Sequence, residues 1–409
     1  MPSSISSSST SRPPRQWLVG PAAVLLCFTL SLPTATGSIA LGLFALAWLA
    51  AGGWATQWQR WRGSPTAWWS AALLLMLAMG ALYSSASHEQ AGNILGKYAK
   101  LLVLLALLGS LVDPAWRRRA TWAFLSGAVL ASALSYARFA GVVPQAWVGS
   151  VVQGHIHFGI IEACAAYLFA RQAIEAGPRR WLWALISALL AFDVLYVGIG
   201  RSGYVVLFAL IVLLAGQRLG LKGVVIGGVC ALLAAAVTFT ALPPARLRLE
   251  QGLQNLRQYE RVEATHEGSL VGNSWGLRLR FWHNTLRIIA VHPLVGSGTG
   301  SMPGEYARIA PKDLDTSNAH NEYLNTTEQI GLIGLVLLLG MGIAAWRDAA
   351  LLPALQRDAT QGVLVAIGTG SLFNSLLMDV NEGRFFVVML GVLLAASIGT
   401  ARQRVGASP

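Results

Sequence analysis

The 409-residue sequence contains few charged residues. Only 12% of its residues are Asp, Glu, Lys or Arg, whereas a typical soluble domain has roughly 25%. So small a charged fraction cannot supply the water-facing surface of a soluble enzyme, and 55% of the residues are hydrophobic. The composition therefore predicts an integral membrane protein.

Cysteine is scarce as well. Only Cys27, Cys164 and Cys230 occur, and all three lie inside apolar runs without the spacing of metal ligands. The sequence also lacks a P-loop, a dinucleotide-binding glycine pattern and a zinc signature. We therefore expect no disulfide framework, no cofactor and no metal.

Two residue pairs are weaker candidates for metal binding. Asp313 and Asp315 form a D-x-D triplet of the kind that some sugar-transferring enzymes use for a divalent ion, but two acidic residues in a polar loop are common by chance. His155 and His157 are two residues apart, a spacing that does not place them on one helix face. The sequence therefore favours a site without metal.

Acidic residues are outnumbered by basic ones, 18 against 30, which gives a net charge of +12. The basic residues occur in short clusters between apolar runs rather than along one continuous stripe. They therefore indicate membrane topology, and we expect no nucleic acid as a partner.

Apolar runs close to the ~20 residues needed to cross a bilayer recur along the whole chain. They lie near residues 17–33, 38–55, 67–86, 99–112, 120–140, 156–171, 181–199, 203–216, 224–243, 322–346, 360–378 and 385–401. We therefore predict an all-α integral membrane protein with about twelve transmembrane helices.

The predicted spans divide the chain into five parts. Residues 1–16 form an amino-terminal tail, 17–243 hold the first nine spans, and 244–321 form one large, mostly helical loop. Residues 322–401 hold the last three spans, and 402–409 form a short tail.

Basic clusters occupy alternate connections between the predicted spans. Their members are Arg12, Arg15, Arg60, Arg62, Arg117, Arg118, Arg119, Arg171, Arg179, Arg180, Arg218, Lys222, Arg347, Arg357, Arg402 and Arg404. Because positive residues favour the cytoplasmic side of short loops, both termini are predicted to be cytoplasmic. The loop 244–321 then lies on the opposite side of the membrane, where long loops are usually functional.

Three arginines are candidates for anion binding at this outer face. Arg201 lies at the outer end of a predicted span, and Arg278 and Arg280 lie in an amphipathic helix that ends at the segment HPLVGSGTG. Guanidinium groups bind phosphate with two hydrogen bonds. A snorkelling arginine and a solvated helix face are the structural alternatives.

A histidine is the candidate base. His320 and Asn321 directly precede a predicted span, with Glu322 next to them. Histidine titrates near neutral pH and can accept a proton from an attacking hydroxyl group. A packed or capping role is the more common one for a single histidine.

Three further basic residues lie at the outer face against the charge bias. Lys97, Lys100 and Arg384 could form, with Arg201, a cationic pocket for a phosphorylated lipid head group. Each residue alone is a weak signal.

Several motifs resemble those of the bacterial O-antigen ligase and polymerase superfamily. RLRFWHNTLRIIAVHPLVGSGTG is similar to a family pattern in which an Arg-Leu-x-x-Trp helix leads into His-Pro-Leu-x-Gly-x-Gly. AHNEYLNTTEQIGLIGLV resembles its His-Asn-x-Tyr-Leu signature, and GRSGY resembles an upstream Ser-Arg-Ser-Gly element with Gly200 in the first position. Arg280 replaces the usual acidic residue of the first motif, so either Arg278 or Arg280 could face the glycan donor that this superfamily uses.

The resemblance implies a glycosyltransferase of GT-C-like fold in the bacterial inner membrane, active on the periplasmic side. Its donor substrate would be an undecaprenyl-diphosphate-linked O-antigen glycan. Membrane lipids would surround the enzyme as further partners. Carried over by position, His320 would be the catalytic base, Arg201 and Arg278 would hold the diphosphate, and Arg280 could share that role. Lys97, Lys100, Arg384 and Asn321 would complete the head-group site.

The acceptor separates the members of this superfamily. One dominant outer loop and a short carboxyl tail favour a ligase, which transfers the glycan to lipid A–core, over a polymerase, which transfers it to another repeat unit. A transporter of lipid-linked glycans is the alternative from another class. It is disfavoured because the two halves of the sequence show no internal similarity.

Overall fold

The computed structural model describes residues 16–144, 154–175, 177–198, 200–265, 270, 272–310 and 316–397. These residues form helices joined by turns, and no strand occurs among them. In chain order the elements are η1 Gln16–Leu18, α1 Val19–Phe28, η2 Thr29–Ser31, α2 Thr34–Ala51, α3 Trp54–Arg62, α4 Pro65–Leu82, α5 His88–Tyr98, α6 Leu101–Ser110, α7 Pro114–Phe139, α9 His155–Glu175, α10 Arg180–Phe192, η3 Asp193–Val197, α11 Arg201–Ala241, α12 Pro243–Thr265, α13 Ser274–Val291, α14 Met302–Ile309, α15 Glu322–Ala349, α16 Ala354–Gly370 and α17 Val380–Leu394.

The predicted all-α membrane fold is confirmed. Seven helical segments of the described chain are long and apolar enough to cross a membrane, namely Thr34–Ala51, Pro65–Leu82, His88–Ser110, Pro114–Phe139, Arg180–Val197, Arg201–Ala241 and Glu322–Ala349. Each of the other predicted spans also falls largely on a helix. The total of about twelve transmembrane helices stays a prediction.

Two of the predicted spans form one continuous helical element that turns back on itself. In α11, Gly220 has φ +61°, and the helix after it packs against the helix before it. A Cβ atom on Gly227 would lie 2.9 Å from the Cα of Val212, so the two halves are in close contact. Only glycine adopts such a backbone easily, and this explains a turn without a connecting loop.

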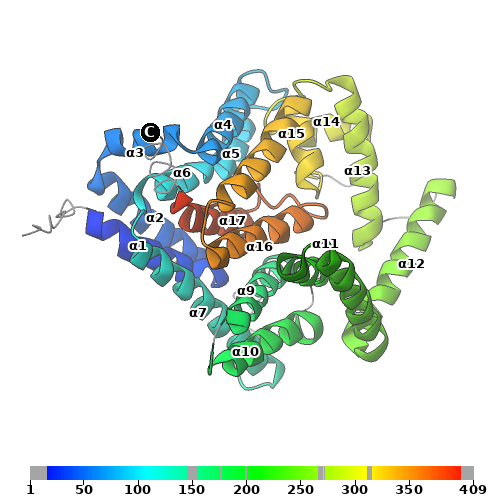
Figure 1. Cartoon of the computed structure of the whole chain (residues 1–409). Coiled ribbons are helices and arrows are strands. Elements are labelled where there is room, and N and C mark those ends of the chain that lie inside the picture. Colours follow the sequence, from blue (N-terminus) through cyan, green and yellow to red (C-terminus); the bar gives the residue numbers. More distant parts are fainter. Residues whose placement is uncertain are drawn as a thin grey trace, which may run out of the picture.

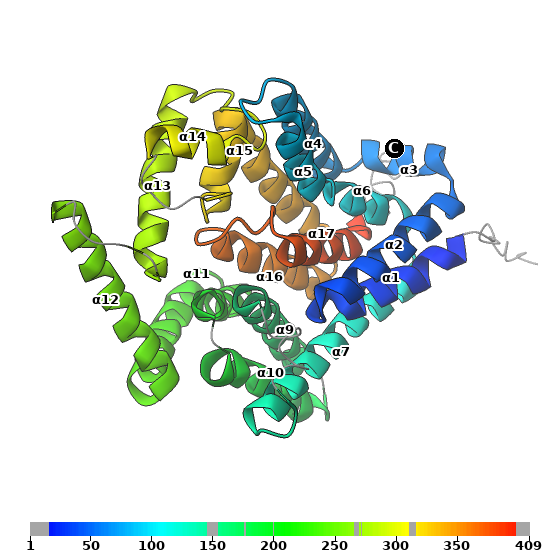
Figure 2. The same cartoon turned by 180° about the vertical axis from the view of Figure 1, so that it is seen from behind.

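The predicted loop 244–321 consists mainly of helices set beside the bundle. α12 packs on α11 and α13, and α13 packs on α14 and α15 (Figure 1). Seen from behind, α12 and α13 lie at the edge of the molecule opposite α1 and α2 (Figure 2). The helical character expected for this loop is therefore observed.

One buried carboxylate near the first residues of α16 joins three helices. The Asp358 carboxylate lies 2.6 Å from Nε of Arg171 on α9, 3.0 Å from Nε of Arg357 and 3.8 Å from Nη2 of Arg218 on α11. The side chains of Arg171 and Asp358 are 0% and 1% exposed. Arg171 also contacts Glu175 at 2.5 Å, so both charges of this buried pair belong to a larger group of opposite charges.

α15 is interrupted near its start. Ile330 and Gly331 leave the helical conformation, with φ values of −132° and +66°. The interruption releases backbone groups from the hydrogen bonds of the helix, and such groups need other partners in a membrane.

The glycine-rich segment at residues 293–298 supplies these partners. The hydrogen bonds run from Ser297 N to Glu328 O (2.9 Å), Gly298 N to Gln329 O (2.9 Å), Leu332 N to Pro293 O (2.8 Å) and Ile333 N to Leu294 O (3.3 Å). The interruption in α15 therefore fixes the end of α13 against the start of α15. The candidate residue Arg278 lies on α13, and the candidate residue His320 lies just before α15.

We predict that Gly331→Ala destabilises the protein whereas Gly342→Ala does not. An alanine at φ +66° is strained by about 1–3 kcal/mol, and its Cβ would overlap the carbonyl group of Leu294. At Gly342, in the same helix, no atom lies within 4 Å of a Cβ position. The melting temperature in detergent should fall for the first variant and stay equal or rise for the second; equal values for both would contradict the proposed role of the interruption.

Candidate functional site

One face of α13 carries three polar side chains at intervals of four residues. The helix begins at Ser274, and the Asn273 side chain caps it by accepting a 2.7 Å hydrogen bond from Gly276 N. Asn273 also donates to the carbonyl of Asn255 on α12 at 2.7 Å, which fixes the start of α13. Ser274, Arg278 and Trp282 therefore project from the same face of the helix.

Arg201 reaches this face from the first residue of α11. Its Nη2 donates to Ser274 Oγ at 2.5 Å, and its guanidinium carbon lies 5.3 Å from the centre of the Trp275 ring. Its Nη1 is buried and has no hydrogen-bond partner among the described residues. Arg201 is thus held in place by two contacts while one of its donors remains unused.

Asn374 connects Arg278 to the start of α11. Its Oδ1 accepts a 3.3 Å hydrogen bond from Arg278 Nη2, and its Nδ2 donates to Ser202 Oγ at 3.1 Å. Nε of Arg278 and Nε1 of Trp282 are both buried without a described partner. Three buried N–H groups, from Arg201, Arg278 and Trp282, are therefore available to an acceptor in this region.

His320 lies beside this group on the loop before α15. Its φ of +49° makes it the one non-glycine residue with positive φ among the described residues. Its backbone N–H donates to Asn318 Oδ1 at 2.8 Å, and Ser375 Oγ donates to the same oxygen at 3.0 Å. The imidazole ring stacks on Phe281 of α13, with ring centres 5.7 Å apart and an interplanar angle of 18°.

Burial and, to a smaller extent, the positive charge of Arg278 lower the pKa of His320 to about 4. The imidazole is therefore neutral at pH 7. Its ring nitrogens have no hydrogen-bond partner among the residues that the structure describes, so one of them is able to accept a proton.

Glu322 holds the loop that follows α16 against this site. The Glu322 carboxylate is buried and accepts hydrogen bonds from Leu377 N at 2.8 Å, Met378 N at 3.2 Å and the Tyr98 hydroxyl at 3.0 Å. The loop residues Asn374 and Ser375 are thereby kept beside Arg278 and Asn318.

Two of the residues expected in the site have other roles. Nε and Nη2 of Arg280 donate to Glu263 on α12 at 3.0 and 2.7 Å, so its charge is neutralised away from Arg278. Asn321 caps α15 by accepting from Leu324 N at 3.1 Å and donates to the carbonyl of Leu372 at 3.0 Å. The structure brings neither side chain to the unused donors.

Lys97, Lys100 and Arg384 lie in a neighbouring region. Lys100 Nζ donates to the carbonyls of Met378, at 3.2 Å, and of Asp379. Arg384 donates to Ser38 Oγ on α2 at 2.9 Å. Lys97 is half-buried on α5. None of the described contacts of these three residues is with Arg201, Arg278 or His320.

Sequence reasoning missed Asn374 and Trp282. Asn374 falls inside the predicted span 360–378, but α16 ends at Gly370 and the residues after it form a loop. The signal was the polar pair Asn374–Ser375 within an apolar run. Trp282 is the tryptophan of the Arg-Leu-x-x-Trp motif, but no role in the site was predicted for it.

The described residues contain no group of three His, Cys, Asp or Glu side chains arranged to hold a metal ion. The D-x-D triplet at residues 313–315 lies outside the described residues.

We predict that Arg278→Gln raises the pKa of His320 whereas Arg280→Gln does not. Removing the positive charge next to the imidazole favours its protonated form, so the pKa should move from about 4 towards the ordinary value. Arg280 is paired with Glu263 and should have no such effect. Histidine NMR titration, with His320→Asn identifying the resonance, measures both; an ordinary pKa in the wild type or equal shifts in both variants would contradict this electrostatic coupling.

Part of the chain matches a known protein family. Residues 186–339 match the family model Wzy_C, described as O-Antigen ligase. The matched segment contains Arg201, Arg278 and His320, and it extends from α10 into α15. No curated protein matches the chain.

Proposed function

We propose that this chain, whose residues 186–339 match the O-antigen ligase family model, is an O-antigen ligase. In this proposal it transfers a glycan from undecaprenyl diphosphate to a sugar hydroxyl of lipid A–core, in the bacterial inner membrane. The arginine distribution supports cytoplasmic termini and a site that faces the periplasm.

The observation that carries the proposal is the group of unused donors. Nη1 of Arg201, Nε of Arg278 and Nε1 of Trp282 are buried without described partners. Leaving such groups unpaired costs free energy, and an anionic ligand with several oxygen atoms would satisfy them. A diphosphate has this chemistry and is also the leaving group of the reaction.

Arg201 and Arg278 would stabilise the negative charge that develops on the departing diphosphate. The two guanidinium groups lie close enough to repel each other, and no carboxylate neutralises either of them among the described contacts. Charge stabilisation by fixed donors in a site with little water is commonly the largest contribution to catalysis. Arg280 has no part in this step, because Glu263 neutralises it.

His320 would act as the general base. The acceptor hydroxyl oxygen attacks the anomeric carbon, the bond from that carbon to the diphosphate oxygen breaks, and the hydroxyl proton passes to the imidazole of His320. Attack opposite the leaving group inverts the anomeric centre. Neither a metal nor a cofactor is needed in this scheme.

We predict that Arg278→Gln lowers kcat about 10²–10³-fold, as expected for the loss of one charge-stabilising donor. The assay uses purified protein, undecaprenyl-diphosphate-linked glycan and lipid A–core with EDTA. Arg280→Gln is the matched control, two residues away, and should be nearly as active as the wild type.

The products of this assay separate the alternatives. Modified lipid A–core supports the ligase. Longer glycan without modified lipid A–core would establish a polymerase. Movement of the lipid-linked glycan across vesicles without either product would establish a transporter. Equal loss of activity in the two arginine variants would contradict the assigned diphosphate site.

We predict that His320→Asn folds normally and is about 10²–10⁴-fold less active, as expected for the loss of a general base. Asparagine tolerates the positive φ at this position, so the melting temperature should stay close to that of the wild type. Activity close to the wild-type level in this variant would rule out His320 as the base.

A further inference from the structure

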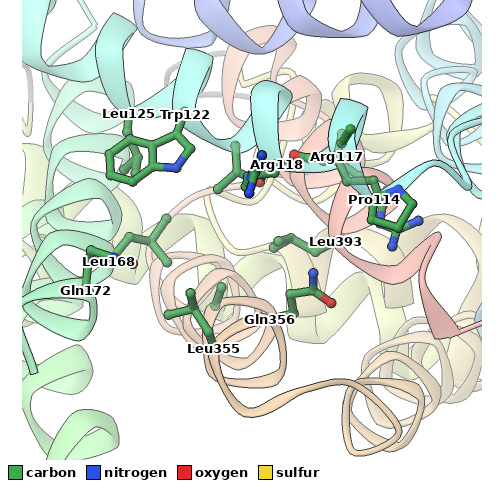
Figure 3. Close-up of a pocket in the computed structure, with 14 residues that line it drawn as sticks. Pro114, Arg117, Arg118, Trp122, Leu125, Leu168, Gln172, Leu355, Gln356 and Leu393 are labelled. Atoms are coloured by element: carbon green, nitrogen blue, oxygen red, sulfur yellow. Dashed lines mark hydrogen bonds between the residues drawn. The ribbon is translucent and has the colours of Figure 1, made fainter. Parts of the chain in front are cut away.

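A cavity of about 540 Å³ lies at the end of the bundle away from His320. The first turns of α7 and α16 and the last turns of α9 and α17 surround it (Figure 3). α16 runs from this cavity to the loop that carries Asn374, and its 17 residues rise about 25 Å. The cavity is therefore separate from the proposed glycosyl-transfer site.

The cavity is positively charged. Arg117 and Arg118 are among its fourteen lining residues, and no Asp or Glu is. Arg117 is only 7% exposed; its Nη1 donates to the carbonyls of Leu111 and Val112, while its Nε is buried without a described partner. The Arg118 side chain is exposed and has no described hydrogen bond.

One helix start adds to this positive potential, that of α16, whereas the Asp113 carboxylate caps the start of α7 by accepting a hydrogen bond from Ala115 N at 3.0 Å. α7 begins at Pro114 and α16 begins at Ala354, and residues from the first turn of each helix line the cavity. The start of a helix carries a partial positive charge that favours anions. The two arginines and the start of α16 therefore favour the same kind of ligand, an anion.

The remainder of the lining is largely apolar. Four apolar side chains line the cavity beyond the arginines or across from α7, namely Trp122, Leu125, Leu168 and Leu393 (Figure 3). Tryptophan beside arginine is typical of the level where the hydrocarbon meets the head groups. A free inorganic anion would leave this apolar surface uncovered, whereas an amphiphile would cover both the arginines and the apolar part of the lining.

We infer that this cavity binds an anionic phospholipid of the adjacent leaflet, with its phosphate at Arg117 and Arg118 and the start of an acyl chain along Trp122 and Leu168. Basic pockets between transmembrane helices are known to suit anionic head groups. The carboxyl-terminal residues 398–409 are a poorer occupant, because they contain Arg402 and Arg404 and no Asp or Glu.

Native mass spectrometry of the full-length protein with added phosphatidylglycerol tests this inference. Arg118→Gln should weaken binding about tenfold, the effect of losing one charge-assisted contact. Arg118 is exposed, so this change should not disturb folding. Arg119→Gln is the matched control, because Arg119 stacks on Trp116 at 4.6 Å and does not line the cavity.

Phosphatidylcholine, which has no net charge, should bind more weakly than phosphatidylglycerol. Equal binding of the two lipids, unchanged binding by Arg118→Gln, or the same loss in Arg119→Gln would overturn the inference. Inorganic phosphate that displaces the lipid at similar concentration would instead assign a free-anion site. The assay measures binding alone, so its result is independent of the proposed glycosyl transfer.

Discussion

Backbone groups inside a membrane must find hydrogen-bond partners within the protein, and this constraint governs the construction of the site. The interruption of α15 at Gly331 releases such groups, and residues 293–298 bind to them. The same contact holds α13 beside α15. Because Arg278 lies on α13 and His320 lies just before α15, their relative position depends on these backbone hydrogen bonds together with the stacking of His320 on Phe281.

The site combines features that do not stabilise the folded protein. Arg201 and Arg278 repel each other, three buried N–H groups lack described partners, and His320 has a positive φ. Each of these features costs free energy. Their concentration at one place is typical of functional sites, where the ligand or the transition state supplies the missing interactions.

Much of the fold was predictable because membrane spans leave a strong local pattern. Arg278 lies close enough to Arg201 and to His320 for its charge to act on both, and the role of all three in a site stays a prediction. The pairing of Arg280 with Glu263 was not predictable, because the two residues are 17 positions apart in the chain. Asn374 lay within the predicted span 360–378, so the sequence did not indicate that it belongs to a loop. Chain spacing shows which residues share a helix face, but it does not show which partner occupies the facing helix.

The carboxylate of Asp358 also has a consequence for biogenesis. Arg171, which it neutralises, lies 187 residues earlier in the chain, and Arg218 also precedes it. During membrane insertion these arginines are made long before Asp358, and until α16 arrives Arg171 has only Glu175 of its own helix as a described carboxylate partner. The last helices to be synthesised therefore close the bundle, and the earlier ones reach their final packing only after synthesis is nearly finished.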